Sequence, residues 1–329
     1  MKRIQANRFL TIGLDRNYQK QSSKSEKRTN ILKKEDSHIG YQSISNLYKD
    51  KRILAFKHVY ALEKVHGTSA HIGYRKDEDK LFFYSGGESH DKFVALFNQE
   101  DLLQRFRTLA TEHAVNRICL YGEAYGGKQQ GMSHTYGPTL HFIAFDCNVD
   151  EKWLSITQSE TVAFTLGVEF VPYELVETTD DALNFERDRD SIVAIRRGMG
   201  KGKKREGVVL RPPFEVTTNN GERICAKHKR EDFAEHKSKR SLDVDPAVLE
   251  NAEAIAEEWC VMNRLHHVIQ HLTINGKEPM MEDMSKIIGE MVADIYREAK
   301  GEIVESKLVE RAIGAKTVKL FKQYLREKP

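Results

Sequence analysis

The hydrophobic pattern of this chain changes its period at about residue 245, and this change limits the folds that are open to it. Between about Tyr41 and Phe233 the pattern consists of short runs rich in β-branched and aromatic residues, with turn signals between them. Two longer stretches, residues 91–114 and 159–166, have helical spacing. This combination predicts an α+β domain built on antiparallel sheet. The predicted strands are residues 60–63, 81–84, 117–121, 140–145, 207–210 and 223–226.

Beyond Asp245 the chain has only helical patterns. Asp245 suits an N-cap and Pro246 suits the first turn of a helix, and the apolar spacing then continues to a stop signal at Asn275 and Gly276. Three helices are predicted, over residues 246–274, 284–301 and 304–325. The predicted parts of the chain are an N-terminal extension with a polar linker at 1–40, a mixed domain at 41–243 and a helical domain at 244–329.

The overall charge of the chain is close to neutral. It has 329 residues, with 52 Lys or Arg against 49 Asp or Glu, which gives a net charge of +3. A nucleic-acid surface must therefore come from local clusters of basic residues. Three basic runs occur, at residues 201–205, 227–230 and 237–240. Such a run is commonly a solvated loop, so each alone leaves open whether it contacts a phosphate.

The cysteines and the apolar runs constrain the compartment. The four cysteines are widely separated and form no CxxC pair, which argues against a zinc site and a disulfide framework and favours a reducing cytoplasm. No apolar run is long enough to cross a bilayer, and no hydrophobic stretch follows the charged start of the chain. We therefore expect a protein that is neither secreted nor membrane-bound. Residues 20–38 are polar and aperiodic, which predicts a linker whose function the sequence does not reveal.

The most informative short motif is the heptapeptide at residues 63–69, in which Lys64 lies two residues before a His-Gly pair. A lysine in this setting can present an amine nucleophile to ATP. The amine attacks phosphorus only when it is unprotonated, so its surroundings must lower its pKa. Lys227 and Lys229 alternate on a predicted strand, so both could project toward the same phosphates and lower that pKa through their charge. The alternative for these two lysines is an ordinary solvated strand face.

Two glutamates and one aromatic residue stand at the ends of predicted strands. Glu123 ends a strand before a glycine pair, where a carboxylate can accept a ribose hydroxyl or reach a metal. Glu206 opens a strand after a basic loop, where a carboxylate could hold Mg²⁺ near phosphates. Phe145 offers a ring on which a purine could stack. Taken singly, each glutamate is more commonly a surface residue and Phe145 a core residue.

Two further patterns do not indicate a site. Residues 122–129 have the P-loop spacing through Gly-Lys, but Gln129 stands where Ser or Thr must bind Mg²⁺. His267 and His271 lie four residues apart on a predicted helix and could share a metal, but no third ligand accompanies them. We therefore reject a P-loop, and we interpret the two histidines as surface or packing residues.

Five segments, taken in order, resemble the motifs of the covalent nucleotidyltransferase superfamily of ATP-dependent ligases and RNA-capping enzymes. Within it, the chain resembles the RNA ligase 2 family, which includes the phage T4-type and trypanosome editing ligases. That family carries His-Gly after the lysine, as His66 and Gly67 do here, whereas DNA ligases and capping enzymes usually carry Asp-Gly. Residues 259–269 are similar to the first helix of the family's C-terminal domain. The five segments are residues 63–69, 120–123, 142–146, 206–211 and 225–229.

The resemblance implies an antiparallel-sheet nucleotidyltransferase fold, ATP-grasp-like and typical of ligase adenylation domains, followed by the small all-α domain. It also implies a reaction in three steps. The amine of Lys64 attacks the α-phosphate of ATP to form lysyl-AMP, the AMP passes to a 5′-phosphate RNA end, and the 3′-OH of the abutting strand displaces AMP to seal the nick. The expected cofactors are ATP and Mg²⁺, with Mn²⁺ as a substitute. The expected partner is nicked duplex RNA or an RNA/DNA hybrid, bound by a monomer in the cytoplasm, or in the host cytoplasm if the protein is phage-encoded.

The same resemblance assigns roles to individual residues of these motifs. The catalytic residues would be Lys64 as the nucleophile, Lys227 and Lys229. The metal ligand would be Glu206, with Glu123 and Asp146 as further candidates. The residues that bind ATP would be Glu63 and Phe145 around the adenine, Glu123 at the ribose, Lys227 and Lys229 at the phosphates, and His66, Gly67, Thr68 and Arg211 in support.

Three features depart from the family pattern. After the nucleophile, the family often has an arginine just before Thr-Gly or Ser-Gly, whereas this chain has Tyr84 before Ser85, so what replaces that arginine is open. Arg211 stands where a lysine is common, which keeps the charge but changes the geometry of the donors. The N-terminal extension at residues 1–40 lies outside the resemblance.

Two other functions are compatible with parts of the pattern. A DNA ligase or a guanylyl-transferring capping enzyme would use the same type of site on a different substrate. A nucleic-acid-binding module with a decayed catalytic site would need only the basic runs. The intact nucleophile, carboxylates and paired lysines argue against this second alternative. The sequence does not reveal the strand chemistry preferred on each side of the nick, the biological pathway or the affinity for ATP.

Overall fold

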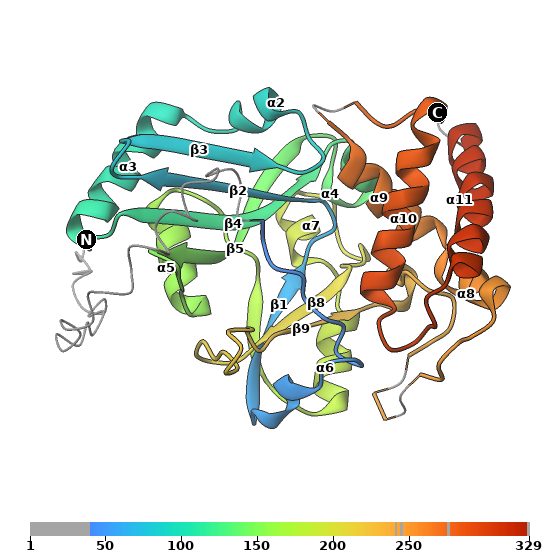
Figure 1. The fold of residues 1–329 in the computed structure, drawn as a ribbon. Coiled ribbons are helices and arrows are strands. Elements are labelled where there is room, and N and C mark those ends of the chain that lie inside the picture. The colour runs from blue at the N-terminus through green and yellow to red at the C-terminus, as the bar shows by residue number, and fades with distance from the viewer. Residues whose placement is uncertain (1–39, 241, 244–245, 275–276, 328–329) are drawn as a thin grey trace, which may run out of the picture. The chain divides into compact units, whose positions relative to one another are not determined.

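Two antiparallel sheets form the framework of the N-terminal two thirds of the described chain (Figure 1). The computed structural model describes residues 40–240, 242–243, 246–274 and 277–327. The first sheet has the strand order β7-β1-β8-β9 and the second the order β3-β2-β4-β5-β6, with only antiparallel pairings between these strands. The predicted α+β class is therefore confirmed. The linker predicted at residues 20–38 lies outside the described residues.

The strands match most of the predicted positions, with four differences. β2, β6 and β7 were not predicted, and the strand predicted at residues 223–226 is wrong, because β9 begins only at Ala226. Arg223 instead forms an isolated bridge with Thr217. The strands are β1 His58–Lys64, β2 Thr68–Arg75, β3 Lys80–Ser85, β4 Arg117–Gly126, β5 Leu140–Val149, β6 Lys152–Trp153, β7 Tyr173–Glu177, β8 Gly207–Arg211 and β9 Ala226–Lys229.

Short helices cover the sheets and supply their cores. In α3, Leu102, Phe106, Leu109 and Ala110 are buried at helical spacing, so one stripe of the helix packs against the second sheet. A smaller core under the first sheet includes Val59, Ala61 and Leu183. The helices of this region are η1 Arg52–Ala55, α2 His90–Val94, α3 Gln99–Glu112, η2 Gln129–Gly131, α4 Ser133–Tyr136, α5 Ile156–Thr165, α6 Asp180–Asp188, α7 Ile192–Arg196 and η3 Glu231–Phe233.

The single helix predicted at residues 91–114 is two helices. α2 ends at Val94, and α3 begins at Gln99 after Asn98, whose side-chain oxygen accepts a hydrogen bond from the backbone N–H of Asp101. The first helix has its C-cap at Ala95, and Asn98, with extended backbone angles, caps the second. The apolar spacing continues across the break, and periodicity alone therefore merges the two helices.

The C-terminal region is all helical and has a hydrophobic core of its own. Its buried apolar side chains include Trp259, Leu265, Met291 and Phe321, and every member of this core lies between Leu249 and Tyr324. None of the helices among the described residues is both long and apolar enough to cross a membrane. The helices are α8 Ala252–Trp259, α9 Met262–Leu272, η4 Met281–Asp283, α10 Met284–Glu298 and α11 Lys307–Glu327.

The helix predicted at residues 246–274 is also two helices. Cys260 and Val261 leave the helical conformation, with ψ values of 84° and 160°, and α9 starts at the next residue. The N-cap of α8 is Asn251, which accepts a hydrogen bond from the N–H of Ala254, and not the predicted Asp245. The N-cap predicted at Asp245 and the stop signal at residues 275–276 lie outside the described residues. The last two helices, α10 and α11, lie close to their predicted positions.

Candidate active site

The register of the first sheet brings Lys64 and Lys229 to the same face. Lys64 in β1 pairs with Gly207 in β8, and Gly207 pairs with Lys229 in β9. Lys227 lies two residues before Lys229, so its side chain projects from that face as well. The three lysines named by the sequence motifs are therefore brought together by strands that are far apart in sequence.

Gly207 is the position between the two lysines that carries no side chain. Its φ is +151°, a conformation that side-chain-bearing residues rarely adopt, and a Cβ built there would lie 2.2 Å from the carbonyl oxygen of His228. Any side chain would therefore push β9 away from β8. The glycine keeps Lys229 within reach of the residues around Lys64.

Gly207→Ala is expected to destabilise the protein and to displace β9. Overpacking of this kind costs about 1–3 kcal/mol, and the unfavourable φ adds to it. Urea unfolding monitored by circular dichroism would measure the loss. The matched control is Gly289→Ala in α10, where no atom lies within 4 Å of the added Cβ, and which should stabilise the helix by about 0.5–1 kcal/mol. Equal stability of the two variants would contradict this account of Gly207.

Glu206 lies at the centre of a cluster of charges on this face. Its carboxylate lies 2.9 Å from Nζ of Lys64, 3.0 Å from Nδ1 of His66 and 3.0 Å from Nζ of Lys229. Only 1% of Glu206 is exposed. Burial alone would raise its pKa, but Lys64, Lys229 and His66 hold the pKa of Glu206 well below its usual value. Glu206 is therefore ionised and fixes the Lys64 amine beside His66.

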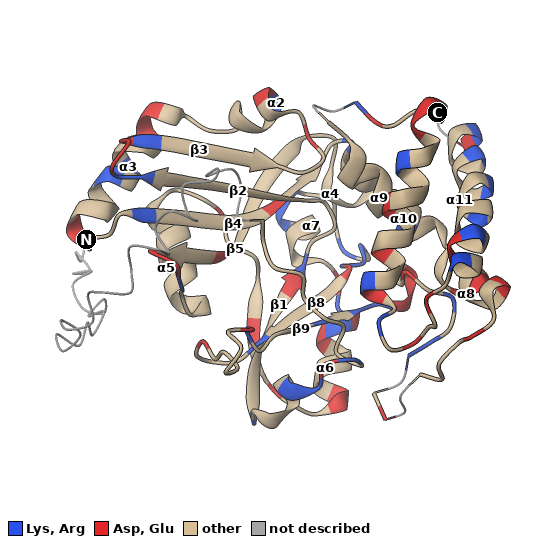
Figure 2. Cartoon of the chain, in the orientation of Figure 1, with Lys and Arg blue, Asp and Glu red and all other residues tan. Residues whose placement is uncertain are grey.

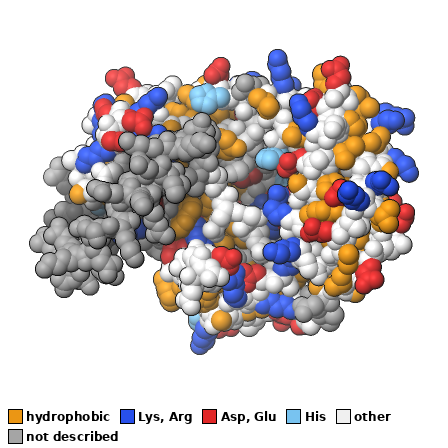
Figure 3. Space-filling model, viewed as in Figure 1, with side chains coloured by type: hydrophobic (Ala, Val, Ile, Leu, Met, Phe, Trp, Pro, Cys, Tyr) orange, Lys and Arg blue, Asp and Glu red, His pale blue; other side chains and the backbone are white. Residues whose placement is uncertain are grey.

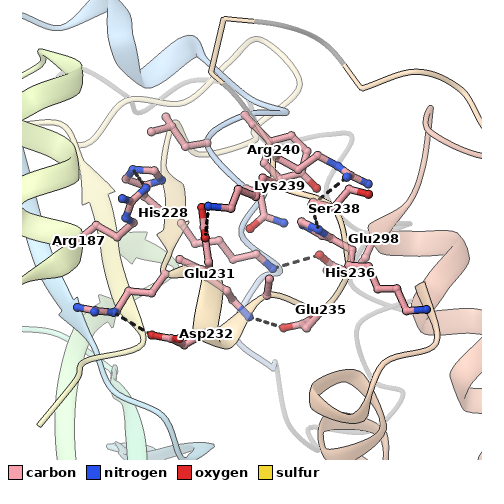
Figure 4. Close-up of a pocket in the computed structure, with 18 of the residues that line it drawn as sticks. Arg187, His228, Glu231, Asp232, Glu235, His236, Ser238, Lys239, Arg240 and Glu298 are labelled. Atoms are coloured by element: carbon pink, nitrogen blue, oxygen red, sulfur yellow. Dashed lines mark hydrogen bonds and ion pairs between the residues drawn. The ribbon is translucent and has the colours of Figure 1, made fainter. Parts of the chain in front are cut away.

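Lys227 and Lys229 each have a further carboxylate partner from outside the predicted motifs. Lys229 pairs with Glu235, and Nζ of Lys227 lies 3.2 Å from Oε2 of Glu298 in α10. Both carboxylates point into a basic cavity of about 350 Å³ between the first sheet and the helical region (Figure 4). Burial and the charge of Lys229 lower the pKa of Lys227. Burial would also lower the pKa of Lys229, but Glu235 and Glu206 hold it above its usual value.

An apolar pocket of about 250 Å³ adjoins two of the three lysines. Lys64 and Lys227 line it, and Lys227 also lines the basic cavity, so the two spaces meet at this side chain. Phe145 is half-buried in its wall and packs edge-on against Tyr41, with 4.9 Å between the ring centroids. An apolar wall beside cationic groups suits a ligand with a flat base and phosphates. The apolar lining consists of Tyr41, Ile44, Leu62, Val65, Phe145, Val171 and Val209.

The side chain of Glu63 is engaged away from the apolar pocket. Its carboxylate accepts hydrogen bonds from Oγ of Ser191 at 2.5 Å and from the backbone N–H of Ile192 at 2.9 Å, at the start of α7. Burial raises the pKa of this carboxyl group. Because the carboxylate is fully buried, only the rest of Glu63 can contact a ligand in the pocket. If Glu63 lies beside the adenine as expected, it is therefore the main chain of Glu63, and not its carboxylate, that contacts the base.

Glu123 connects the Lys64 motif to the opposite sheet. Its Oε1 accepts a hydrogen bond from the N–H of Gly67 at 3.0 Å, and burial raises the pKa of Glu123 to about 7. A Cβ on Gly67 would lie 2.3 Å from the carbonyl oxygen of Ala124, so the close approach of the two segments requires a glycine. Oγ1 of Thr68 accepts a hydrogen bond from the N–H of Gly87 at 2.8 Å. Gly67 and Thr68 thus hold the motif in place through their backbone and hydroxyl contacts.

Glu123 and Glu206 are the two carboxylates of the site that could hold a metal ion. Both line a further pocket of about 360 Å³, together with Lys64 and His66. Carboxylate oxygens are suitable ligands for Mg²⁺, which usually keeps several waters and phosphate oxygens in its coordination shell. Within the described ranges, no group of three or more His, Cys, Asp or Glu side chains could hold a metal ion alone. The arrangement therefore fits an ion that takes part of its coordination from a bound phosphate.

Asp146 does not reach this site, contrary to its predicted role as a possible metal ligand. Its carboxylate is fully buried and pairs with Nη1 of Arg211 at 2.8 Å and Nη1 of Arg223 at 2.6 Å. The hydroxyl of Tyr41 donates to the same carboxylate at 2.8 Å. Since both oxygens are bound, Asp146 has no free position for a metal. Arg211, which was expected to support ATP binding, lines the apolar pocket, but its guanidinium group forms ion pairs with Asp146 and Glu215.

The residues of the rejected P-loop and of the rejected histidine metal site have contacts within the protein. Gln129 of the P-loop-like stretch is buried and donates a hydrogen bond to Glu88. Nδ1 of His267 lies 3.1 Å from Oε1 of Glu235, and its ring centroid lies 5.8 Å from that of His66. His271 is exposed and pairs with Glu290. His267 is therefore a packing residue, as interpreted from the sequence, but the sequence did not indicate that it packs beside His66 and Glu235.

Several residues around the site carried no usable signal in the sequence. Glu235 follows β9 on an irregular segment, and Glu298 and Gln270 come from α10 and α9. Gln270 donates a hydrogen bond to the carbonyl oxygen of Gly67 at 2.8 Å. The helical region thus contacts the Lys64 motif and the β9 lysines directly. Only the run of charged residues after Lys229 could have suggested any of these contacts.

Comparison with known proteins gives one family match and several similar structures. The family model of RNA ligase matches residues 57–229, a range that contains all five motifs. Among solved structures, a Naegleria gruberi RNA ligase with PPi has a TM-score of 0.46 and 18% identity, and a mutant of that ligase with ATP and Mn has the same values. Another mutant, with AMP and Mn, has a TM-score of 0.42 and 17% identity. Each match covers 59% of this chain and 57% of the other, so the chain spans less than two thirds of those ligases.

Proposed function

This chain belongs to the RNA ligase family, since the family model matches more than half of it, and we propose that it joins RNA ends in an ATP-dependent reaction through a lysyl-AMP on Lys64. The observation that carries this proposal is the position of Lys64. Lys64 lines an apolar pocket, and its amine pairs with the buried carboxylate of Glu206, which also pairs with Lys229. The apolar pocket is complementary to a base and a ribose, and the lysines are complementary to a chain of phosphates.

The proposed reaction has three steps. The unprotonated amine of Lys64 attacks the α-phosphorus of ATP, a P–N bond forms, and the bond to pyrophosphate breaks. A 5′-phosphate oxygen of RNA then attacks the same phosphorus and releases the lysine. Finally, the 3′-OH of the other strand attacks the activated 5′-phosphate and AMP leaves. Lys227 and Lys229 would bind the phosphates whose negative charge increases during each attack.

The binding of ATP follows from the linings of the pockets. The adenine would lie in the apolar pocket beside Phe145 and the main chain of Glu63, and the ribose would bind near Glu123. A divalent ion, Mg²⁺ or Mn²⁺ as a substitute, would be held by Glu206 with Glu123 nearby. When bound, such an ion neutralises charge on the phosphates. Glu206 would then share its charge between the ion and the amines that it contacts in this structure.

The substrate that we propose is nicked duplex RNA or an RNA/DNA hybrid, bound by a monomer in a reducing cytoplasm. The His66-Gly67 pair supports the RNA ligase 2 branch of the family by resemblance. His66 contacts Glu206 and packs edge-on against Phe233, so it belongs to the site. The four cysteines are buried and unpaired, which agrees with a reducing compartment.

The proposal is tested by incubating the protein with ATP labelled at either end of the triphosphate. Label at the α-phosphate should remain on the protein after denaturation, and label at the γ-phosphate should leave with pyrophosphate. Retention of the γ-label would contradict the proposed chemistry. Replacing ATP by GTP then distinguishes a capping-type enzyme.

The substrate class needs a separate experiment. Nicked duplexes should be compared in which RNA or DNA is placed independently at the 3′-OH strand, the 5′-phosphate strand and the template. Sealing is expected to require RNA in at least one joined strand. Efficient sealing of an all-DNA nick would instead favour the DNA ligase alternative.

A further inference from the structure

The charges of the helical region are strongly separated along the chain. α11 contains six Lys or Arg and two Glu, whereas residues 246–306 contain five Lys or Arg and twelve Asp or Glu. The basic residues of α11 form a series along the helix (Figure 2). Because the rest of the helical region is acidic, this concentration of positive charge on one helix does not follow from the composition of the region.

Five of these cations lie on one side of α11. Lys307, Arg311, Lys319, Lys322 and Arg326 are all exposed, and their spacing places them within one third of the helix circumference. The opposite side buries Val309, Ile313, Thr317 and Phe321 against the other helices. In the space-filling view, Lys and Arg side chains project along the edge that α11 occupies (Figure 3). We call these five residues the α11 stripe.

The charges of the α11 stripe have no ion-pair partners in the described part of the chain. Among the residues that the structure describes, none of the five forms an ion pair, although Lys316 on the flank of the helix pairs with Glu257. Lys307 and Arg311 lie four residues apart, and so do Lys322 and Arg326, so like charges repel each other along the stripe. A solvated helix face usually alternates charges of opposite sign. A polyanion that binds the stripe would relieve this repulsion.

The geometry selects one kind of polyanion. A membrane surface is the poorer candidate, because an interfacial helix gains much of its binding energy by inserting its apolar face, and the apolar face of α11 is occupied by the protein core. From Lys307 to Arg326 the stripe is about 28 Å long, at 1.5 Å per residue. A straight row of flexible cations of this length matches a backbone of regularly spaced phosphates.

We propose that the α11 stripe binds the phosphate backbone of duplex RNA outside the ends that are joined. This inference rests on the proposed function and extends it to the substrate. α11 packs against α8 and α10, and α10 lies between it and the sheets that carry the active site (Figure 1). The stripe therefore holds the RNA and takes no part in the attack on ATP. Its contacts are electrostatic and independent of the RNA sequence.

The test is a triple variant, Arg311→Gln, Lys319→Gln and Lys322→Gln. Glutamine has a similar helix propensity and keeps a flexible polar side chain, although a shorter one, while it removes the charge. Binding to nicked duplex RNA, measured by fluorescence anisotropy at several KCl concentrations, should weaken. The slope of log affinity against log salt should fall by about 0.9 for each lost phosphate contact, up to about 2.7.

Two further variants make the result specific. The matched control, Lys76→Gln with Lys80→Gln and Lys152→Gln, removes the same charge from exposed lysines in the β2–β3 turn, β3 and β6, and it should bind RNA like the wild type. Arg311→Lys with Lys319→Arg and Lys322→Arg keeps the charge, and it should bind normally. Wild-type affinity and salt slope in the glutamine variant would overturn the inference, and so would an equal loss in the matched control.

Labelling by ATP separates this inference from the proposed function. The glutamine variant should form lysyl-AMP at the wild-type rate, because the stripe is remote from Lys64. If the wild type forms no lysyl-AMP, the proposed function fails, while the comparison of RNA binding still decides the role of the stripe. A variant that has lost both its helix content and its labelling would have misfolded. In that case the single variants Arg311→Gln and Lys322→Gln would be compared in the same way.

Discussion

Lys64→Ala and Lys64→Arg are both expected to reduce covalent labelling by ATP to background. Alanine removes the amine, and arginine keeps a positive charge beside Glu206 but stays protonated at any pH at which the protein is folded. The loss should therefore be complete in both variants. Gel autoradiography after incubation with α-labelled ATP measures it. Labelling that survives at another residue would contradict the assignment of Lys64.

Controls can show that these variants lose chemistry and not structure. Lys57→Arg, at an exposed lysine just before β1, should label like the wild type. The free energy of unfolding of Lys64→Arg should lie within about 0.5 kcal/mol of the wild-type value, since the ion pair with Glu206 is retained. An RNA that already carries AMP on its 5′-phosphate bypasses the first step, so Lys64→Ala should still seal it. Failure on that substrate as well would show that the substitution damages more than the nucleophile.

Asp146→Asn is expected to cause the largest loss of stability, about 3–5 kcal/mol. The substitution keeps the shape of the side chain but removes one of the two carboxylates, Asp146 and Glu215, that the buried Arg211 and Arg223 share. Breaking a buried ion pair by removing one partner costs this amount, because the remaining charge stays desolvated. Arg223 also stacks on Trp153, with 4.1 Å from its guanidinium carbon to the ring centroid, so it cannot easily move toward water.

The measurement is urea unfolding of Asp146→Asn beside Asp101→Asn. Asp101 pairs with Arg105 on the surface of α3, with 55% of its side chain exposed, so its loss should cost no more than about 1 kcal/mol. Labelling of folded Asp146→Asn by ATP at low temperature should persist. If Asp146 were a metal ligand, that labelling would fail while stability changed little, which is the outcome that would contradict the buried-network account.

The sequence predicted the fold class well because the motif strands carry strong local patterns. β1, β5 and β8 have β-branched and aromatic runs that local reasoning detects. The sequence analysis failed where the apolar periodicity continues across a non-helical junction between two helices. The extended backbone at Cys260 lies inside such a period and separates α8 from α9. The segment from Ala95 to Asn98 interrupts the helix predicted at residues 91–114 in the same way.

The candidate site was predictable only as far as its motifs extend. The strand register brings Lys64 and Lys229 together, and alternation along one strand was enough to predict that Lys227 and Lys229 share a face. The carboxylates that pair with these lysines depend on tertiary packing. Glu298 comes from a helix 71 residues beyond Lys227 in the sequence. The role expected for Asp146 failed for a related reason, because both arginines that bind it come from segments more than 60 residues later.

The carboxylate partners of the three lysines have a consequence for ligand selection. Lys64 and Lys229 share Glu206, and Lys227 is bound to Glu298. A phosphate that enters this cluster replaces one anion with another, so the net electrostatic gain is smaller than at a bare cation. Inorganic phosphate and pyrophosphate have only this exchange to drive their binding. A nucleotide also buries its base in the apolar pocket, so the paired lysines would disfavour free phosphates and leave the choice of ligand to the base.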